Sequence, residues 1–195
     1  MLKKDPAMAP LLKRHGPPNL ADRHGRVSLF ESLVRSIVYQ QLSGKAAGAI
    51  HARILALFPA RPTPELLLKI RSPRLRACGL SLAKIAYVRD LAEKCIDGTV
   101  NEKRFPKMSS EEITEHLVAV KGIGEWTAHM MLIFKLHRLD ILPVGDLAIR
   151  KGFQKVYRLP HMPTKKEMEK IAAPWRAHAS IASWYLWEEV SKRPT

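Results

Sequence analysis

The sequence predicts an all-α fold, and three observations support this. Apolar residues recur at helical spacing along most of the 195 residues. A Ser or Thr followed three residues later by Glu, the pattern of an N-terminal capping box, begins three of these segments, at Ser28, Ser109 and Thr164. No stretch of useful length alternates apolar and polar residues as a half-buried strand would.

The expected helices follow one another with clear starts. A short helix is expected over residues 5–15, and the apolar spacing from Phe30 to Val38 predicts a core helix after Ser28. Pro64 suits the first position of a helix capped by Thr63. The other helices are expected to begin at Ser43, Ser72, Ser81, Ser109, Trp126, Asp146, Thr164 and Pro174.

The charge of the chain favours a polyanionic partner. Lys and Arg number 33 and Asp and Glu 18, which gives a formal net charge of +15. A merely basic, solvated surface is the alternative interpretation. No apolar run is long enough to span a membrane, and the N-terminus lacks the apolar core of a signal peptide. A cytoplasmic location is expected, at the nucleoid in a bacterium or in the nucleus of a eukaryote, without a membrane partner.

The stretch from Leu117 to Arg150 holds the most informative motif. Gly122-Ile123-Gly124 separates two helical patterns. The two glycines allow positive φ and leave the backbone bare, so successive amide N–H groups can face outward at the start of the next helix. This arrangement predicts an anion site, and the expected anion is a nucleic-acid phosphate.

Asp146 follows Leu142-Pro143-Val144-Gly145 at the N-cap position of another helix. An ordinary capping aspartate is one interpretation. The other is catalysis, because a carboxylate in a water-poor site can stabilise a developing cation and can orient or deprotonate a water molecule.

Together these features resemble the helix-hairpin-helix (HhH-GPD) DNA glycosylase superfamily, and within it the alkylation-repair branch of 3-methyladenine DNA glycosylase II. The features are the helix–Gly-Ile-Gly–helix and the aspartate after Pro-Val-Gly. The similarity extends to Tyr39-Gln40-Gln41-Leu42-Ser43 and to Pro174-Trp175-Arg176 with Trp184, so it covers residues 30–186.

The resemblance implies a role for each motif, with Asp146 as the catalytic residue. The base pocket would be lined by Trp126, Trp184, Tyr39 and Met130, although core packing is the alternative for both tryptophans. Gln41 would be the wedge that fills the DNA stack, with Leu42 as the alternative. The DNA backbone would be held by Lys121, Gly122, Ile123, Gly124 and Thr127. Trp175 and Trp187 are expected to be core aromatics.

The residue two positions after Gly124 decides the expected reaction. Bifunctional members carry a lysine there, whose amine leads to strand cleavage, whereas this chain has Trp126. The resemblance therefore implies a monofunctional enzyme without AP-lyase activity. It would hydrolyse the N-glycosidic bond of alkylated bases, such as 3-methyladenine and 7-methylguanine, in double-stranded DNA and leave an abasic site. The alternatives are a glycosylase for an oxidised or deaminated base and a non-catalytic DNA-binding module.

The expected architecture has two lobes with the active-site cleft between them. One lobe comprises residues 1–61 and 135–195 and carries Asp146, and the other comprises residues 62–134. The few residues before Phe30 leave no room for the β-domain of larger family members, and two cysteines, Cys78 and Cys95, exclude a four-cysteine iron–sulfur cluster. We expect a monomer without cofactor or side-chain metal site, although the resemblance implies a Na⁺ or K⁺ ion on hairpin carbonyls.

Overall fold

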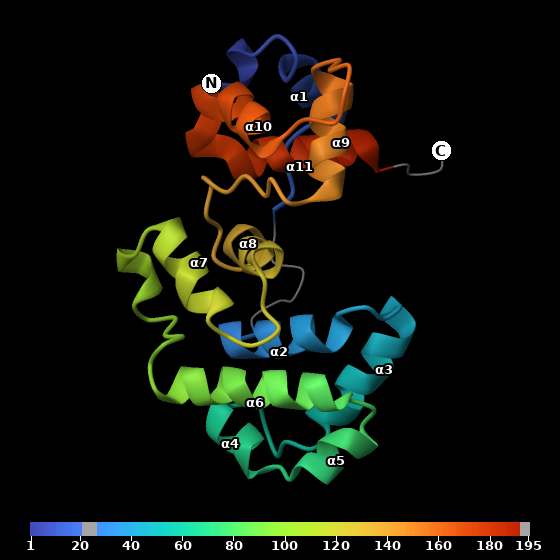
Figure 1. The fold of residues 1–195 in the computed structure, drawn as a ribbon, viewed down its shortest axis with the longest axis vertical. Coiled ribbons are helices and arrows are strands. Elements are labelled where there is room, and N and C mark those ends of the chain that lie inside the picture. The colour runs from blue at the N-terminus through green and yellow to red at the C-terminus, as the bar shows by residue number, and fades with distance from the viewer. Residues whose placement is uncertain (21–26, 192–195) are drawn as a thin grey trace. The chain divides into compact units, whose positions relative to one another are not determined.

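The computed structural model describes residues 1–20 and 27–191, and every regular element in this part of the chain is helical (Figure 1). The prediction of an all-α fold is therefore confirmed. The chain divides into two compact units. Unit 1 comprises Met1–Arg23 and Leu132–Thr195, and unit 2 comprises His24–Met131. None of the described helices is both long and apolar enough to cross a membrane.

Unit 2 is built around one long central helix, α6. Its elements are α2 (Leu29–Tyr39), α3 (Gly44–Leu55), α4 (Pro64–Lys69), α5 (Ser72–Ala77), α6 (Leu82–Ile96), η2 (Phe105–Lys107), α7 (Ser110–Val118) and the first part of α8 (Glu125–Phe134). Helix α6 packs against α2 on one side and against α4 and α5 on the other, as Figure 1 shows. Leu33, Ile37 and Leu91 are fully buried in this packing.

This packing places residues 24–61 differently from the predicted lobes. The expected division joined residues 1–61 to the C-terminal segment, whereas the structure groups residues 24–61 with residues 62–131. The reason is that α2 contacts both α3 and α6, so its apolar face is covered from within unit 2. Sequence periodicity identifies an apolar face but does not identify the helix that covers it.

Unit 1 is a smaller helical bundle around the contact of α9 with α11. Its elements are η1 (Leu2–Lys4), α1 (Ala9–His15), the end of α8, α9 (Leu147–Val156), α10 (Lys165–Ala172), η3 (Ala173–His178) and α11 (Ala179–Val190). The largest side chains of its core are Trp175 and Phe153, whose rings stack at a centroid distance of 6.0 Å. Gly152 allows the close approach of α9 and α11, because a Cβ atom there would lie 2.9 Å from the Cβ of Leu186.

The predicted helix starts are mostly confirmed by cap hydrogen bonds. Ser28, Ser109 and Thr164 each form a complete capping box with the Glu three residues later. Single side-chain caps at Ser43, Thr63 and Ser81 begin three other predicted helices, whereas α5 begins at Ser72 without a side-chain cap. These caps depend on residues three positions apart, which explains why the local sequence predicts them.

Two terminal helices begin later than predicted. Helix α1 begins at Ala9, because the carboxylate of Asp5 accepts hydrogen bonds from the amides of Ala7 and Met8 and holds the preceding turn. The last helix was expected to begin at Pro174, but that segment is η3, where Trp175 is non-helical (φ −125°, ψ 21°). The regular helix α11 therefore begins at Ala179.

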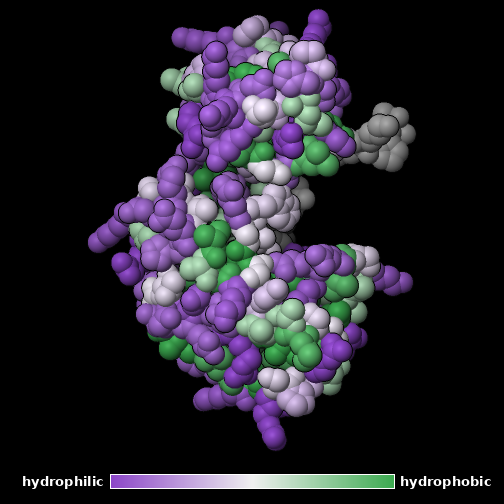
Figure 2. All heavy atoms as spheres, viewed as in Figure 1, coloured by the Kyte–Doolittle hydropathy of each residue, from purple (hydrophilic) through white to green (hydrophobic). Residues whose placement is uncertain are grey.

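Polar and charged residues dominate the face of each unit that Figure 2 shows. Hydrophilic residues cover most of the face of both units seen in Figure 2, and the apolar residues there form only small patches. The large apolar side chains that remain exposed include Leu42, Leu82, Trp126 and Leu147. Leu42 and Trp126 are themselves predicted site residues, and Leu147 directly follows the predicted catalytic residue Asp146.

Candidate functional site

The predicted hairpin is formed by the end of α7, residues 119–124 and the start of α8. Gly122 has a positive φ of 78°, as expected, whereas Gly124 does not. A Cβ atom at Gly122 would overlap the ring of Tyr87, while one at Gly124 would meet nothing within 4 Å. The first glycine is thus required by the fold of unit 2, and the second leaves exposed backbone that a ligand can approach.

Two of the hairpin amides are already used inside unit 2. The amide of Lys121 donates to Asp90 Oδ2 at 2.8 Å, and the amide of Ile123 donates to the carbonyl of Val120 at 3.0 Å. The Lys121 ammonium also lies 3.6 Å from Asp90 Oδ1, although its side chain is largely exposed. The two glycines are exposed, so their amides are accessible to a phosphate, whereas Ile123 is buried and anchors the turn within unit 2.

The predicted wedge lies in a tightly held elbow between α2 and α3. The ammonium of Lys84 donates to the carbonyl oxygens of Val38 at 2.8 Å and Gln40 at 2.7 Å. Burial lowers the pKa of Lys84. These bonds close the end of α2 and leave Gln41 exposed in the left-handed region, with φ 55°. Leu42, the alternative wedge, is 42% exposed.

A pocket of about 350 Å³ brings most of the predicted base-binding residues together within unit 2. Its walls come from α2, the elbow and α8, and its lining residues are Ser32, Arg35, Ser36, Tyr39, Gln40, Gln41, Trp126, Thr127, Met130 and Met131. Trp126 is 52% exposed, whereas tryptophan is highly buried on average. Thr127, predicted to contact the DNA backbone, is largely buried and also lines this pocket.

The ring of Tyr39 is in contact with a cationic side chain. The Arg35 guanidinium carbon lies 4.1 Å from the centroid of the Tyr39 ring, a cation–π geometry. The ring of His51 also meets Tyr39 edge-on, at a centroid distance of 6.2 Å. Tyr39 is therefore held from two sides, and Arg35 is a pocket residue that sequence reasoning did not single out.

Asp146 caps α9 in unit 1, as predicted. Its Oδ1 accepts a hydrogen bond from the amide of Ile149 at 2.9 Å. The same oxygen accepts one from the indole Nε1 of Trp187 at 3.3 Å. The residue is half-buried, and its own amide donates to the carbonyl of Pro143 at 2.9 Å, which fixes the turn before the helix.

Trp184 lies in the core of unit 1 and Trp187 packs against it, which for Trp184 is the predicted alternative to the base pocket. Trp184, predicted to line the base pocket, is only 8% exposed and belongs to the core of unit 1. Its ring meets Tyr185 and His15 edge-on. Trp187, predicted to be a core aromatic, is half-buried and bonds to Asp146. An indole N–H near a helix end needs a hydrogen-bond partner, and this requirement is the signal that could have identified Trp187.

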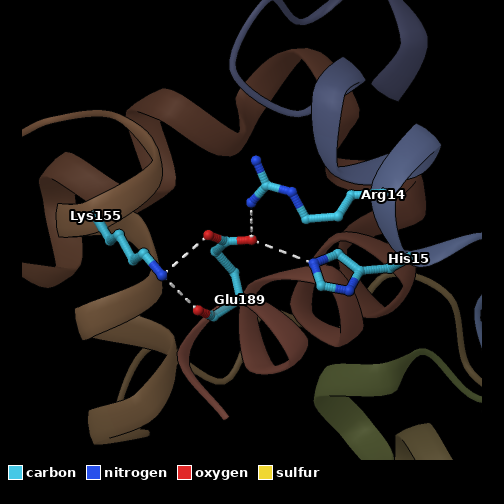
Figure 3. A network of polar contacts seen from close by, with 4 residues as sticks. All are labelled: Arg14, His15, Lys155 and Glu189. Atoms are coloured by element: carbon cyan, nitrogen blue, oxygen red, sulfur yellow. Dashed lines mark hydrogen bonds and ion pairs between the residues drawn. The ribbon is translucent and has the colours of Figure 1, made fainter. Parts of the chain in front are cut away.

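A charged network around Glu189 joins three helices of unit 1. Figure 3 shows its carboxylate between Arg14 (2.7 Å) and His15 (3.2 Å) of α1 and Lys155 (3.0 Å) of α9. Lys155 also donates to the carbonyl of Glu189 at 2.8 Å. Burial alone would raise the pKa of Glu189, but the hydrogen bonds from Lys155, His15 and Arg14 outweigh it and lower the pKa to about 2.

The described residues contain no group of three or more His, Cys, Asp or Glu side chains that could hold a metal ion. Cys78 is buried, and burial raises the pKa of the partly buried Cys95 thiol to about 12, so the thiolate needed for metal binding is disfavoured. In the hairpin, the carbonyl oxygens of Val120 and Gly122 accept hydrogen bonds from Ile123 and Gln40. The monovalent ion on hairpin carbonyls stays a prediction.

Comparisons with known proteins give consistent matches. Residues 34–177 match the family described as HhH-GPD superfamily base excision DNA repair protein. DNA-3-methyladenine glycosylase 1 of Schizosaccharomyces pombe is 41% identical over 165 residues, which cover 82% of this chain and 71% of that protein.

Solved structures agree with the sequence matches. A Schizosaccharomyces pombe 3-methyladenine DNA glycosylase in complex with abasic DNA has a TM-score of 0.78 at 35% identity and covers 100% of this chain and 97% of its own. A DNA-3-methyladenine glycosidase from Bacillus halodurans has a TM-score of 0.80 at 30% identity, with 97% and 91% covered.

Proposed function

The chain belongs to the HhH-GPD superfamily of base excision DNA repair proteins, and we propose that it is a monofunctional DNA-3-methyladenine glycosylase. Its substrate would be double-stranded DNA that contains alkylated bases, and its product an abasic site. The observation that carries this proposal is the pocket lined by Tyr39, Trp126 and Met130. Its volume of about 350 Å³ lies within the usual range of small-molecule sites, roughly 300–1,000 Å³.

The pocket chemistry supports an alkylated base as the ligand. Alkylation at N3 of adenine or N7 of guanine leaves the base cationic, and an exposed indole such as Trp126 attracts a cationic ring by stacking and cation–π contact. The methionines Met130 and Met131 add polarizable, adaptable walls. No lysine lines this pocket, which supports hydrolysis by water rather than attack by an amine.

Asp146 would supply the charge that the reaction needs. In the proposed step, the bond from C1′ to the base nitrogen breaks and its electron pair leaves with the base. The cationic sugar is stabilised by the Asp146 carboxylate until water adds to C1′, and the proton of that water passes to the carboxylate. The hydrogen bonds of Asp146 Oδ1 hold the group in one orientation before the reaction begins.

Base release from methylated duplex DNA tests the proposal. The native chain should release methylated bases, and nicks should appear only after alkali treatment of the abasic product. Asp146→Asn should lower release by at least about 100-fold, because it removes the charge while Asn still caps the helix. Asp140→Asn, in the preceding loop, is the matched control and should retain release. No release by the native chain despite DNA binding would contradict the proposal.

A second candidate function, release of a neutral oxidised or deaminated base, is favoured by Arg35. Its guanidinium lies over the Tyr39 ring, where a cationic base would otherwise stack, and it can donate hydrogen bonds to a base with acceptor atoms. The same release assay with duplexes that contain hypoxanthine or an oxidised purine decides between the two. Faster release of these bases than of 7-methylguanine would favour the second candidate.

A further inference from the structure

The hydrogen bond between Trp187 and Asp146 is a feature for which the family resemblance gave no expectation. The indole Nε1 of Trp187 donates to Asp146 Oδ1 at 3.3 Å, and the Ile149 amide donates to the same oxygen at 2.9 Å. The amide comes from the helix that Asp146 caps, whereas the indole comes from α11. Two donors from different helices therefore fix one oxygen of the carboxylate.

The fold of unit 1 holds Trp187 in this place. Its ring stacks on Phe134, with a centroid distance of 5.8 Å and an interplanar angle of 27°. The preceding residue, Leu186, packs against Gly152 of α9, where the missing side chain lets the two helices approach. Two residues later, Glu189 is joined to Lys155 of α9 (Figure 3). The contacts of Leu186, before Trp187, and of Glu189, after it, thus fix the position of the indole relative to Asp146.

We propose that Trp187 is a positioning residue for Asp146, an inference that rests on the proposed role of this carboxylate. A carboxylate stabilises a developing cation best when its orientation is fixed in advance, because no reorganisation is then needed as the charge forms. The Ile149 bond comes from the helix that Asp146 itself caps. The Trp187 bond adds a restraint from a different helix and so limits rotation of the carboxylate.

Trp187→Phe tests this inference, because phenylalanine keeps an aromatic ring against Phe134 and lacks the N–H group. The single-turnover rate of base release should fall about 10- to 100-fold, the effect of removing one hydrogen bond to a charged group. Trp187→Leu, which also lacks a polar donor, is the second variant in case the first unfolds. Thermal unfolding of each variant checks whether the fold is retained.

A second readout separates positioning from a merely structural role. Duplex DNA with a pyrrolidine abasic analogue carries a positive charge at the sugar, and DNA with the tetrahydrofuran analogue is neutral. The native chain should bind the cationic duplex more tightly, as expected for a transition-state analogue. Trp187→Phe should reduce this preference about tenfold and leave the affinity for the neutral duplex within about twofold. In the Asp146→Asn background, Trp187→Phe should have no further effect.

Trp175→Phe is the matched control. Trp175 lies in the same unit, stacks on Phe153 and also donates an indole N–H to a carboxylate, Asp5 Oδ2 at 3.0 Å. Loss of this hydrogen bond in Trp175→Phe should lower the stability of the protein. The preference for the cationic duplex should stay unchanged, because Asp5 has no role in the proposed reaction.

The outcomes of this experiment are distinct. If Trp187→Phe and Trp187→Leu keep the native rate and preference while Asp146→Asn loses both, the positioning role is wrong and the proposed function stands. If Trp175→Phe reduces the preference as much as Trp187→Phe, the effect is structural and the inference is overturned. If the native chain neither releases bases nor prefers the cationic duplex, the proposed function itself fails.

Discussion

The side-chain amide of Gln40 donates a hydrogen bond to the carbonyl oxygen of Gly122 at 2.7 Å, across 82 positions of sequence. This bond joins the elbow after α2 to the hairpin before α8. Lys84 of α6 in turn donates a hydrogen bond to the backbone carbonyl of Gln40, so α6 also holds the end of α2. In the proposed enzyme, the segment that probes the DNA stack and the segment that binds the DNA backbone are thus held together within unit 2.

Gln40→Glu should weaken this connection. The substitution keeps the size of the side chain but replaces the N–H donor by an acceptor, which the Gly122 carbonyl repels. We expect the free energy of unfolding to fall by about 1 kcal/mol and the affinity for abasic DNA to fall about tenfold. Urea denaturation and DNA-binding titrations measure the two effects. Unchanged affinity would mean that the hairpin and the elbow bind DNA independently of this bond.

The two hairpin glycines should respond differently to alanine. Gly122→Ala places a Cβ atom against Tyr87 at a positive φ of 78°, so we expect a loss of about 2–4 kcal/mol of stability. Gly124→Ala meets nothing within 4 Å, so the change in stability should be below about 0.5 kcal/mol. Its Cβ atom would instead obstruct a phosphate, and we expect an affinity loss of about tenfold for abasic DNA.

Thermal unfolding and DNA binding of both glycine variants check this prediction, and each variant serves as the control for the other. A stable Gly122→Ala protein would show that Tyr87 can move away. Native DNA affinity of Gly124→Ala would show that the exposed backbone at this position is not where the phosphate binds.

Features that depend on neighbouring residues were predictable from the sequence. The capping boxes at Ser28, Ser109 and Thr164 and the cap at Asp146 join residues three positions apart, so the local pattern contains all the information. The apolar spacing after Ser28 likewise predicted α2. These features were sufficient for the helical fold and for the placement of Asp146 at a helix start.

Features that depend on packing between distant segments were not predictable. Gln40 and Gly122, and likewise Trp187 and Asp146, come together only after the helices have packed. The same holds for residues 24–61, whose place in unit 2 follows from the contact of α2 with α6. Arg35 was missed for another reason, because an arginine on a helix normally indicates only a solvated face.

Gln41→Gly should identify the wedge. Gln41 has a left-handed φ of 55°, which glycine adopts without strain, so stability should stay within about 1 kcal/mol of the native value. We expect base release from fully paired duplex DNA to fall about tenfold, because the gap left by the extruded base is no longer filled. Release from a substrate with a mismatched lesion should fall less, since less unstacking energy is needed there.

Leu42→Ala is the comparison for the elbow, because Leu42 is exposed beside Gln41. It should leave release from paired DNA within about twofold if Gln41 is the wedge. The reverse pattern, a large loss with Leu42→Ala and none with Gln41→Gly, would assign the wedge to Leu42. Gln41→Asn tests whether the length of the amide side chain matters, since Asn also tolerates a left-handed φ.

Glu189 should make the stability of unit 1 sensitive to acid. Its pKa is lowered to about 2 in the folded protein from an ordinary value of 4.5. A carboxylate with a lowered folded-state pKa stabilises the fold above its unfolded-state pKa, and this stabilisation is lost as the pH falls through the folded-state value. The loss should therefore occur between about pH 5 and pH 2. Near neutral pH, Glu189→Gln should lower the free energy of unfolding by about 1–2 kcal/mol, and the difference from the native protein should disappear toward pH 2.

Urea denaturation of both proteins between pH 2 and pH 7 gives this difference directly. Glu169→Gln is the control, because Glu169 forms only an exposed ion pair with Lys165 at 3.9 Å, and its effect should be below about 0.5 kcal/mol at every pH. A Glu189→Gln effect that is constant with pH would contradict the lowered pKa and would indicate that Glu189 stabilises α11 through packing alone. A pH-dependent effect would indicate that the ionised Glu189 stabilises unit 1 through its bonds to Arg14 and His15 of α1 and to Lys155 of α9.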